Sequence, residues 1–245
     1  IDSHSEFVPG WDKKLIHMVE TANAEKPVIS TYPPDSKQKW QNSVGFRMCD
    51  SEIAKAQIEW QIIRLTNSQP FDKVVPDIPK YAPFVAAGFL FLPADFLHEV
   101  PFDPFLPWIF MGEEISMSAR MWTSGYDIFS PTTNVLNHYY VRRHYPKFWE
   151  TTNRFFKNPA VHNNIVEIVI NRVKCMLGYP ESRPDMIEPK SLLYRQHEYG
   201  MGNKRSYEDY LRMVGIDFDS KSITPNTWCR KGVWPELAKQ YYVKK

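Results

Sequence analysis

The stretch GEEISMSARMWTSGYDIFS, residues 112–130, joins a helical pattern to a strand pattern without a break. After the first glycine, apolar side chains recur at the i, i+4, i+7 spacing of one helix face: Ile115, Ala119 and Trp122. Gly125 ends this pattern, and the aromatic and β-branched run that follows it is typical of a strand. The stretch therefore predicts a helix over residues 113–124 that leads into a strand over residues 126–130, an arrangement found in α/β folds.

Other segments carry the same two kinds of pattern. Strand-like runs occupy residues 27–32, 45–49, 62–65, 84–92 and 134–140, and helical spacing occupies residues 11–25, 161–177 and 206–214. Asp12 stands where it could cap the first of these helices, and the run over residues 84–92 reads as a fully buried strand. Strands with helices between them, followed by a helical part, predict an α/β fold. Residues 1–146 would form its core, and residues 147–245 an α-rich C-terminal part packed on the same domain.

The composition excludes several classes of protein. Hydrophobic residues make up 43% and aromatic residues 15% of the 245, too much for a disordered chain. The formal net charge of +2 is spread along the chain, so we expect no nucleic acid and no membrane surface as partner. The longest apolar run, residues 84–92, is far shorter than the ~20 residues of a membrane-spanning helix.

The cysteines and glycosylation motifs bear on the compartment. Cys49, Cys175 and Cys229 are an odd number without metal-site spacing, and no Asn-x-Ser/Thr motif occurs. Both observations favour a reducing compartment. We therefore expect buried thiols and a cytoplasmic protein.

A possible metal site begins at the first residues. Asp2 and His4 are two positions apart, and in extended backbone such side chains point to the same side, so both could bind one ion. His138, in the predicted strand 134–140, is the best candidate for a third ligand, and Arg142 beyond it could hold phosphate oxygens. The alternatives are a solvent-facing His4 and a hydrogen-bonded His138 on an amphipathic strand. Because chain ends normally fray, chemistry this close to Ile1 predicts that a further segment precedes it.

A second set of candidates lies around the start of the helix predicted over residues 113–124. Glu113 and Glu114 suit the positive end of a helix dipole, which is a sufficient structural explanation for one of them. Glu113 and Arg120 also share a helix face that could hydrogen-bond sugar hydroxyls. Trp108 is close enough in sequence to be a pocket candidate, although a tryptophan is more often a core anchor.

Four motifs in order carry a resemblance to known enzymes. DSHSE (2–6), AGFLF (87–91), MGEEI (111–115) and NHYYVR (137–142) are similar to the motifs of polypeptide N-acetylgalactosaminyltransferases. The chain more closely resembles the hydroxyproline-polypeptide α-N-acetylglucosaminyltransferases, which in protists modify an adaptor subunit of SCF-type ubiquitin ligases. That agreement extends over residues 1–12, 86–131, 137–143 and 199–218.

The resemblance implies a GT-A fold, with a mixed central sheet flanked by helices and residues 1–146 as the catalytic core. It also implies a divalent ion, manganese, held by Asp2, His4 and His138. It implies retaining transfer of N-acetylglucosamine from UDP-N-acetylglucosamine to a polypeptide hydroxyl, with hydroxyproline of the SCF adaptor as acceptor. The nucleotide-binding portion that precedes the Asp-x-His motif in such enzymes is not in this sequence, so we expect it upstream.

The resemblance also implies roles for single residues. Gly88 would let the backbone approach the donor sugar closely. Glu113 and Glu114 would orient the sugar or acceptor hydroxyl, in a same-face mechanism where the leaving phosphate takes the acceptor proton; one of them as a covalent nucleophile is the alternative. Arg142 would contact phosphate, although it lies one residue further from the histidine than its counterpart.

Two other functions stay open. One is a transferase of the same fold that uses another UDP-sugar or a threonine or serine acceptor. The other is a non-catalytic sugar-binding or scaffold module. Manganese-dependent release of UDP would separate the enzymes from the module.

Overall fold

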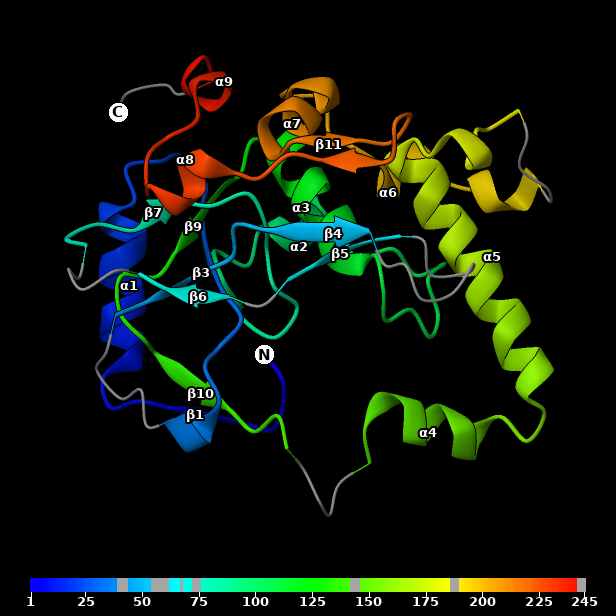
Figure 1. Ribbon diagram of the computed structural model, residues 1–245, viewed down its shortest axis with the longest axis horizontal. Helices are drawn as coiled ribbons and strands as arrows, with labels where there is room; N and C mark the ends of the chain where they lie inside the picture. The colour runs from blue at the N-terminus through cyan, green and yellow to red at the C-terminus, as the bar shows by residue number, and fades with distance from the viewer. Residues whose placement is uncertain are drawn as a thin grey trace.

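A four-stranded mixed sheet forms the centre of the computed structural model, which describes residues 1–38, 44–53, 62–66, 68–71, 76–141, 146–185 and 190–241 (Figure 1). Its order is β7–β9–β2–β8, with bounds Lys80–Tyr81, Asp127–Ser130, Pro27–Ser30 and Leu90–Phe91. β2 runs parallel to β9, and the two outer strands run antiparallel to their neighbours. The predicted mixed sheet of an α/β fold is therefore present.

Two helices pack near this sheet and bury its apolar strands. α1 (Trp11–Thr21) lies against β2, and α3 (Glu113–Thr123) contacts β9. Nearly every residue of α3 is buried, including the predicted apolar positions Ile115, Ala119 and Trp122. The periodicity that identified this helix therefore reflects its packing in the core.

Four two-stranded sheets surround the centre. Their antiparallel pairs are β1 (Ser5–Phe7) with β10 (Leu136–His138), β3 (Phe46–Arg47) with β6 (Gln69–Pro70), β4 (Ser51–Ile53) with β5 (Ile63–Leu65), and β11 (Ile216–Asp217) with β12 (Ser222–Ile223). The first pair joins the start of the chain to residues more than a hundred positions later, because Ser5 lies opposite His138.

The second half of the chain is largely helical, as predicted. Its α-helices are α4 (Phe148–Phe155), α5 (Pro159–Leu177), α6 (Gln196–Tyr199), α7 (Tyr207–Val214), α8 (Thr227–Arg230) and α9 (Glu236–Lys239), while α2 (Phe96–Glu99) belongs to the first half. Short 3-10 turns are η1 (Ser36–Gln38), η3 (Pro180–Ser182) and η4 (Lys190–Leu193). Figure 1 shows α4 standing away from the sheets, near the N-terminal end of α5. One hydrophobic cluster includes residues from both halves, such as Leu15 and Tyr210.

Local structure differs from the predictions at two places. The run 84–92 is not one strand: only β8 is extended, and Ala87 and Gly88 form a turn between the bridged residues Ala86 and Phe89. Phe84, Val85, Ala86 and Phe89 of this run are buried, and an apolar run of this kind fits a buried turn as well as a buried strand. Asp12 does not cap α1, since Gly10 occupies the cap position with φ +73°. Among the described residues, no helix is both long and apolar enough to span a bilayer.

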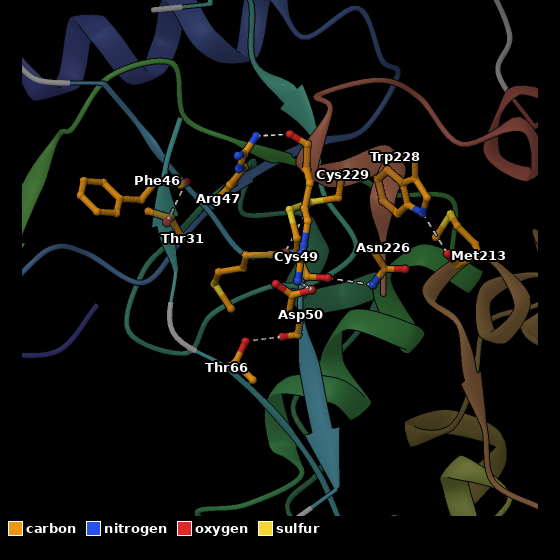
Figure 2. The surroundings of a disulfide bond; sticks show 12 residues. Thr31, Phe46, Arg47, Cys49, Asp50, Thr66, Met213, Asn226, Trp228 and Cys229 are labelled. Carbon is orange, nitrogen blue, oxygen red and sulfur yellow. Dashed lines mark hydrogen bonds and ion pairs between the residues drawn. A yellow bond between two sulfur atoms is a disulfide. The ribbon is translucent and has the colours of Figure 1, made fainter. Parts of the chain in front are cut away.

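A disulfide joins the link between β3 and β4 to α8 near the C-terminal end. Cys49 and Cys229 are 180 residues apart in sequence, yet their Cα atoms are 5.5 Å apart and their sulfurs are bonded. Figure 2 shows the bond beside the Asn226 side chain, whose amide donates to the Cys49 carbonyl over 2.8 Å. The prediction of thiols is therefore wrong for these two cysteines and holds for Cys175, which is buried and free. Sequence spacing could not reveal the pair, because only the return of the C-terminal segment to β3 and β4 brings it together.

Candidate active site

The pairing of β1 with β10 brings three candidate metal ligands together. His138 ends β10, and the Tyr139 amide donates to the His4 carbonyl over 3.1 Å, which fixes His4 beside it. Nε2 of His138 lies 2.9 Å from Oδ2 of Asp2, and Nε2 of His4 lies 3.6 Å from the same oxygen. One ligand atom from each residue falls within 4.8 Å of the others. The three predicted ligands are therefore close together in the fold, although more than 130 residues separate His4 from His138 in the sequence.

The local backbone differs from the extended form expected for Asp2 to His4. Ser3 and His4 lie in a turn that precedes β1, and the Asp2 amide donates to the Gly88 carbonyl over 3.3 Å. The hydrogen bond with His138 lowers the pKa of Asp2, an effect that partial burial opposes. Asp2 therefore remains an anion at neutral pH, as a metal ligand must.

His138 is held by its surroundings. Its side chain is 7% exposed, and its ring lies between those of His4 and Tyr140, with centroid separations of 4.3 and 4.1 Å. The hydroxyl of Tyr140 donates to the Pro33 carbonyl over 2.8 Å, which fixes the ring that covers the histidine. Nδ1 of His138 is buried and has no hydrogen-bond partner among the residues that the structure describes.

These residues fit a divalent cation. One carboxylate and two imidazoles form the mixed oxygen and nitrogen donor set that suits first-row divalent metals. The three donor atoms lie within 4.8 Å of one another, and the three residues border an open cleft from which further ligands could come. A metal that bound here would have room for ligand oxygens.

The cleft has a volume of about 1060 Å³, enough for a nucleotide-sugar-sized ligand. Its described lining residues come from several elements: Asp2, Ser3, His4, Tyr32, Pro33, Glu52, Arg64, Leu65, Thr66, Ala87, Gly88, Phe110, Met111, Glu113, Glu114, His138, Tyr140, Pro146, Lys147 and Phe148. Six predicted site residues are among them: the three metal candidates, Gly88, Glu113 and Glu114. The fold therefore gathers these motifs, which are remote in sequence, around one space.

Gly88 stands beside the candidate metal site. A Cβ added there would come no closer than 3.8 Å to any atom of the described chain, and its nearest neighbours would be Asp2 Oδ2 and Pro33 Cδ. This is ordinary van der Waals contact, so the fold itself does not demand glycine. The missing side chain leaves space in the cleft, directly beside the Asp2 carboxylate.

Glu113 and Glu114 begin α3 and differ in their contacts. Oε1 of Glu114 accepts the Ala87 amide over 2.8 Å, and the Tyr32 hydroxyl donates to Oε2. Burial raises the pKa of Glu114, while these two hydrogen bonds oppose the rise. Oε2 of Glu113 is shielded from solvent and finds no partner among the described residues. Burial, followed by the charge of Glu114, raises the pKa of Glu113 to about 8.

Three other predicted site residues are not in this group. Arg120 donates to the Pro101 and Gly200 carbonyls over 2.6 and 3.2 Å and is buried away from the cleft. Trp108 packs on Phe155 and Phe156 and is not among the lining residues. Arg142 lies outside the described residues.

The cleft also contains residues that sequence reasoning missed. Tyr140 is two positions from His138, so the strand alternation already placed it on the same side. Tyr32 follows β2, whose end meets the sheet edge where ligands of α/β folds commonly bind. Arg64 on β5 forms an ion pair with Glu52 on β4 at 2.5 Å. The sequence did not indicate this pair, because it depends on the pairing of the two strands.

Comparison with known proteins gives one positive result. The model of the family described as Glycosyltransferase (GlcNAc) matches residues 1–220, which include the triad, the Ala87–Gly88 turn and the start of α3. No curated protein compared with the chain matches it. A match over this share of the chain shows that it belongs to the GlcNAc glycosyltransferase family.

Proposed function

We propose that this chain forms the metal and sugar side of a retaining GT-A glycosyltransferase that moves N-acetylglucosamine from UDP-N-acetylglucosamine to a polypeptide hydroxyl. The observation that carries the proposal is the meeting of Asp2, His4 and His138 at a cleft that also holds Gly88 and both glutamates. Glycosyl transfer requires a sugar donor and an acceptor, and a cleft of this size can receive parts of both.

Each part of the cleft has a chemical task in this proposal. Asp2, His4 and His138 would hold a manganese ion, which when bound neutralises diphosphate charge and so favours departure of the nucleotide. Gly88 leaves room for the donor sugar beside Asp2. Glu114, through its hydrogen bond with the Ala87 amide, keeps the Ala87–Gly88 turn in place.

Retention of the anomeric configuration needs either a covalent intermediate or a same-face reaction. The oxygens of Glu114 are occupied by the Tyr32 hydroxyl and the Ala87 amide, and the raised pKa of Glu113 favours its protonated form below about pH 8. Neither is well placed as a nucleophile. We therefore favour the same-face mechanism, in which the cleft positions the reactants and the leaving phosphate accepts the proton.

The acceptor we propose is hydroxyproline of a polypeptide, on the strength of the sequence resemblance. The alternative hydroxyls, threonine and serine, present the same nucleophilic oxygen on a more flexible side chain. A matched set of three peptides that differ only in hydroxyproline, threonine or proline at one position separates these choices. The proline peptide, which lacks a hydroxyl, should accept no sugar.

The compartment needs a different proposal from the cytoplasm predicted above. The Cys49–Cys229 bond is of a kind that persists in oxidising compartments and is rare in the cytosol. We infer that the chain matures in an oxidising compartment. Because all three cysteines are buried, the isolated protein is alkylated in denaturant without reductant: this should label Cys175 alone, whereas labelling of all three cysteines would support the cytoplasm.

The decisive experiment measures UDP release and peptide glycosylation by the complete protein that contains this chain. With UDP-N-acetylglucosamine, manganese and the hydroxyproline peptide, we expect turnover that a chelator abolishes and manganese restores. His138→Ala should abolish it too, while Glu167→Gln, an exposed change on α5, should not. Binding of the sugar nucleotide without release of UDP would indicate a binding module instead.

A further inference from the structure

Two carboxyl groups lie side by side at the beginning of α3, and the fold satisfies only one of them. Glu114 accepts hydrogen bonds from the Ala87 amide and from the Tyr32 hydroxyl. Glu113 lines the same cleft, but its Oε2 is shut off from solvent and accepts no hydrogen bond from any described residue. A buried carboxyl oxygen without a donor is costly, and more so for the carboxylate than for the neutral acid, so these contacts favour a neutral Glu113 in the wall of the cleft.

The different contacts decide which carboxyl carries charge. Two adjacent carboxylates in a shielded site repel each other, so ionisation of one disfavours ionisation of the other. Donors from Ala87 and Tyr32 stabilise the charge of Glu114. Within the described part of the chain no other residue donates to Oε2 of Glu113, and burial together with the charge of Glu114 raises the pKa of Glu113 to about 8.

The charged groups on the surrounding elements do not pair with an ionised Glu113, because each is paired with another residue. These pairs are Arg64 with Glu52 on β5 and β4, Lys174 on α5 with Glu181, and Arg172 on α5 with Asp103. Tyr32 donates to Glu114. Lys147 also lines the cleft, but its charge is not among the causes that set the pKa of Glu113.

We propose, on the basis of the function proposed above, that Glu113 binds the donor sugar as a neutral acid and donates its O–H to an uncharged oxygen of that sugar. Glu114 is then a positioning residue, which holds the Ala87–Gly88 turn rather than the substrate. A neutral acid avoids adding negative charge beside the diphosphate. The two glutamates thus have different tasks, a difference that their adjacent positions in the sequence do not reveal.

The test compares the affinities of UDP-N-acetylglucosamine and UDP for the complete protein, by calorimetry at about pH 7 and about pH 9. With a pKa of about 8, the neutral fraction of Glu113 falls about tenfold over this interval, so the affinity for the sugar nucleotide should fall about tenfold. UDP has no sugar, and its affinity should lack this additional loss. Glu113→Gln keeps a neutral donor, so it should bind the sugar nucleotide within about threefold of wild type and remove the pH effect.

Two further variants complete the comparison. Glu113→Ala should weaken sugar-nucleotide binding by about tenfold at neutral pH and leave UDP binding unchanged. Glu167→Gln, an exposed substitution of the same kind on α5, should reproduce wild type in every measurement. The proposal is overturned if wild-type affinity for the sugar nucleotide is flat over this pH range, if Glu113→Gln is as weak as Glu113→Ala, or if UDP shows the same pH effect.

A titration without substrate keeps this inference separate from the proposed function. Carbon-13 NMR of the carboxyl groups in the metal-free protein, assigned with Glu113→Gln, should find one glutamate that titrates near pH 8. An ordinary pKa for Glu113 would overturn the neutral-acid proposal even if the enzyme transfers the sugar. If the titration behaves as expected but neither nucleotide binds, the proposed donor is wrong, and with it the sugar contact of Glu113.

Discussion

Removal of the Cys49–Cys229 bond should cost much of the stability of this fold. The bond closes a loop of 180 residues, for which the chain-entropy relation gives about 5 kcal/mol. Measured values are typically ~2–4 kcal/mol, because reduced chains retain some structure. We therefore expect the double variant Cys49→Ser/Cys229→Ser to lose about 3 kcal/mol of unfolding free energy.

Urea unfolding followed by tryptophan fluorescence measures this loss. With a slope of about 3 kcal/mol per molar urea for a chain of this size, the midpoint should fall by about 1 M. Reduced wild type should unfold at the midpoint of the double variant, and Cys175→Ser should respond to reductant as wild type does, since Cys175 is free. Equal midpoints for oxidised wild type and the double variant would refute the reasoning.

Further substitutions test the site and the core. His138→Ala removes one of three candidate ligands and should weaken manganese binding by at least ~100-fold, as measured by electron paramagnetic resonance of the free ion; unchanged binding would exclude the triad. Gly88→Ala meets no atom of the chain closer than 3.8 Å, so its melting temperature should stay near wild type while donor affinity falls about tenfold; unchanged affinity would remove Gly88 from the donor site. Asp103→Asn deprives the buried Arg172 of its anion and should cost ~3–5 kcal/mol in urea unfolding, and a loss below ~1 kcal/mol would show that this pair is replaceable.

Helices α1, α3, α5 and α7 and the parallel strands β2 and β9 could be predicted from sequence, because their patterns report burial directly. The helix over 113–124 and the strand over 126–130 occur as α3 and β9, within a residue at most ends. The prediction of one strand over residues 84–92 was wrong, because an apolar run without alternation does not distinguish a strand from a buried turn. That turn carries Gly88 into the cleft, so the failed prediction falls at a site residue.

The residues of the candidate site could be predicted only from short motifs and from the order of those motifs, which a known family shares. Asp2, His4 and His138 were named from the sequence, and the antiparallel register of β1 and β10 explains how they meet. The different environments of Glu113 and Glu114 were not accessible, because they depend on Tyr32 and on the Ala87 amide, which are remote in sequence. Arg120 shows the converse: helical spacing placed it on the face of Glu113, but its guanidinium donates to the Pro101 and Gly200 carbonyls and does not line the cleft.

The segment beyond the family match supports the wall of the cleft. The match ends at residue 220, whereas Cys229 bonds Cys49 and Arg230 pairs with Asp50 at 2.9 Å. Both contacts fall directly before β4, and β4 and β5 line the cleft through Glu52 and Arg64. The disulfide and this ion pair therefore tie the C-terminal segment to the wall of the cleft, so loss of either contact should loosen that wall.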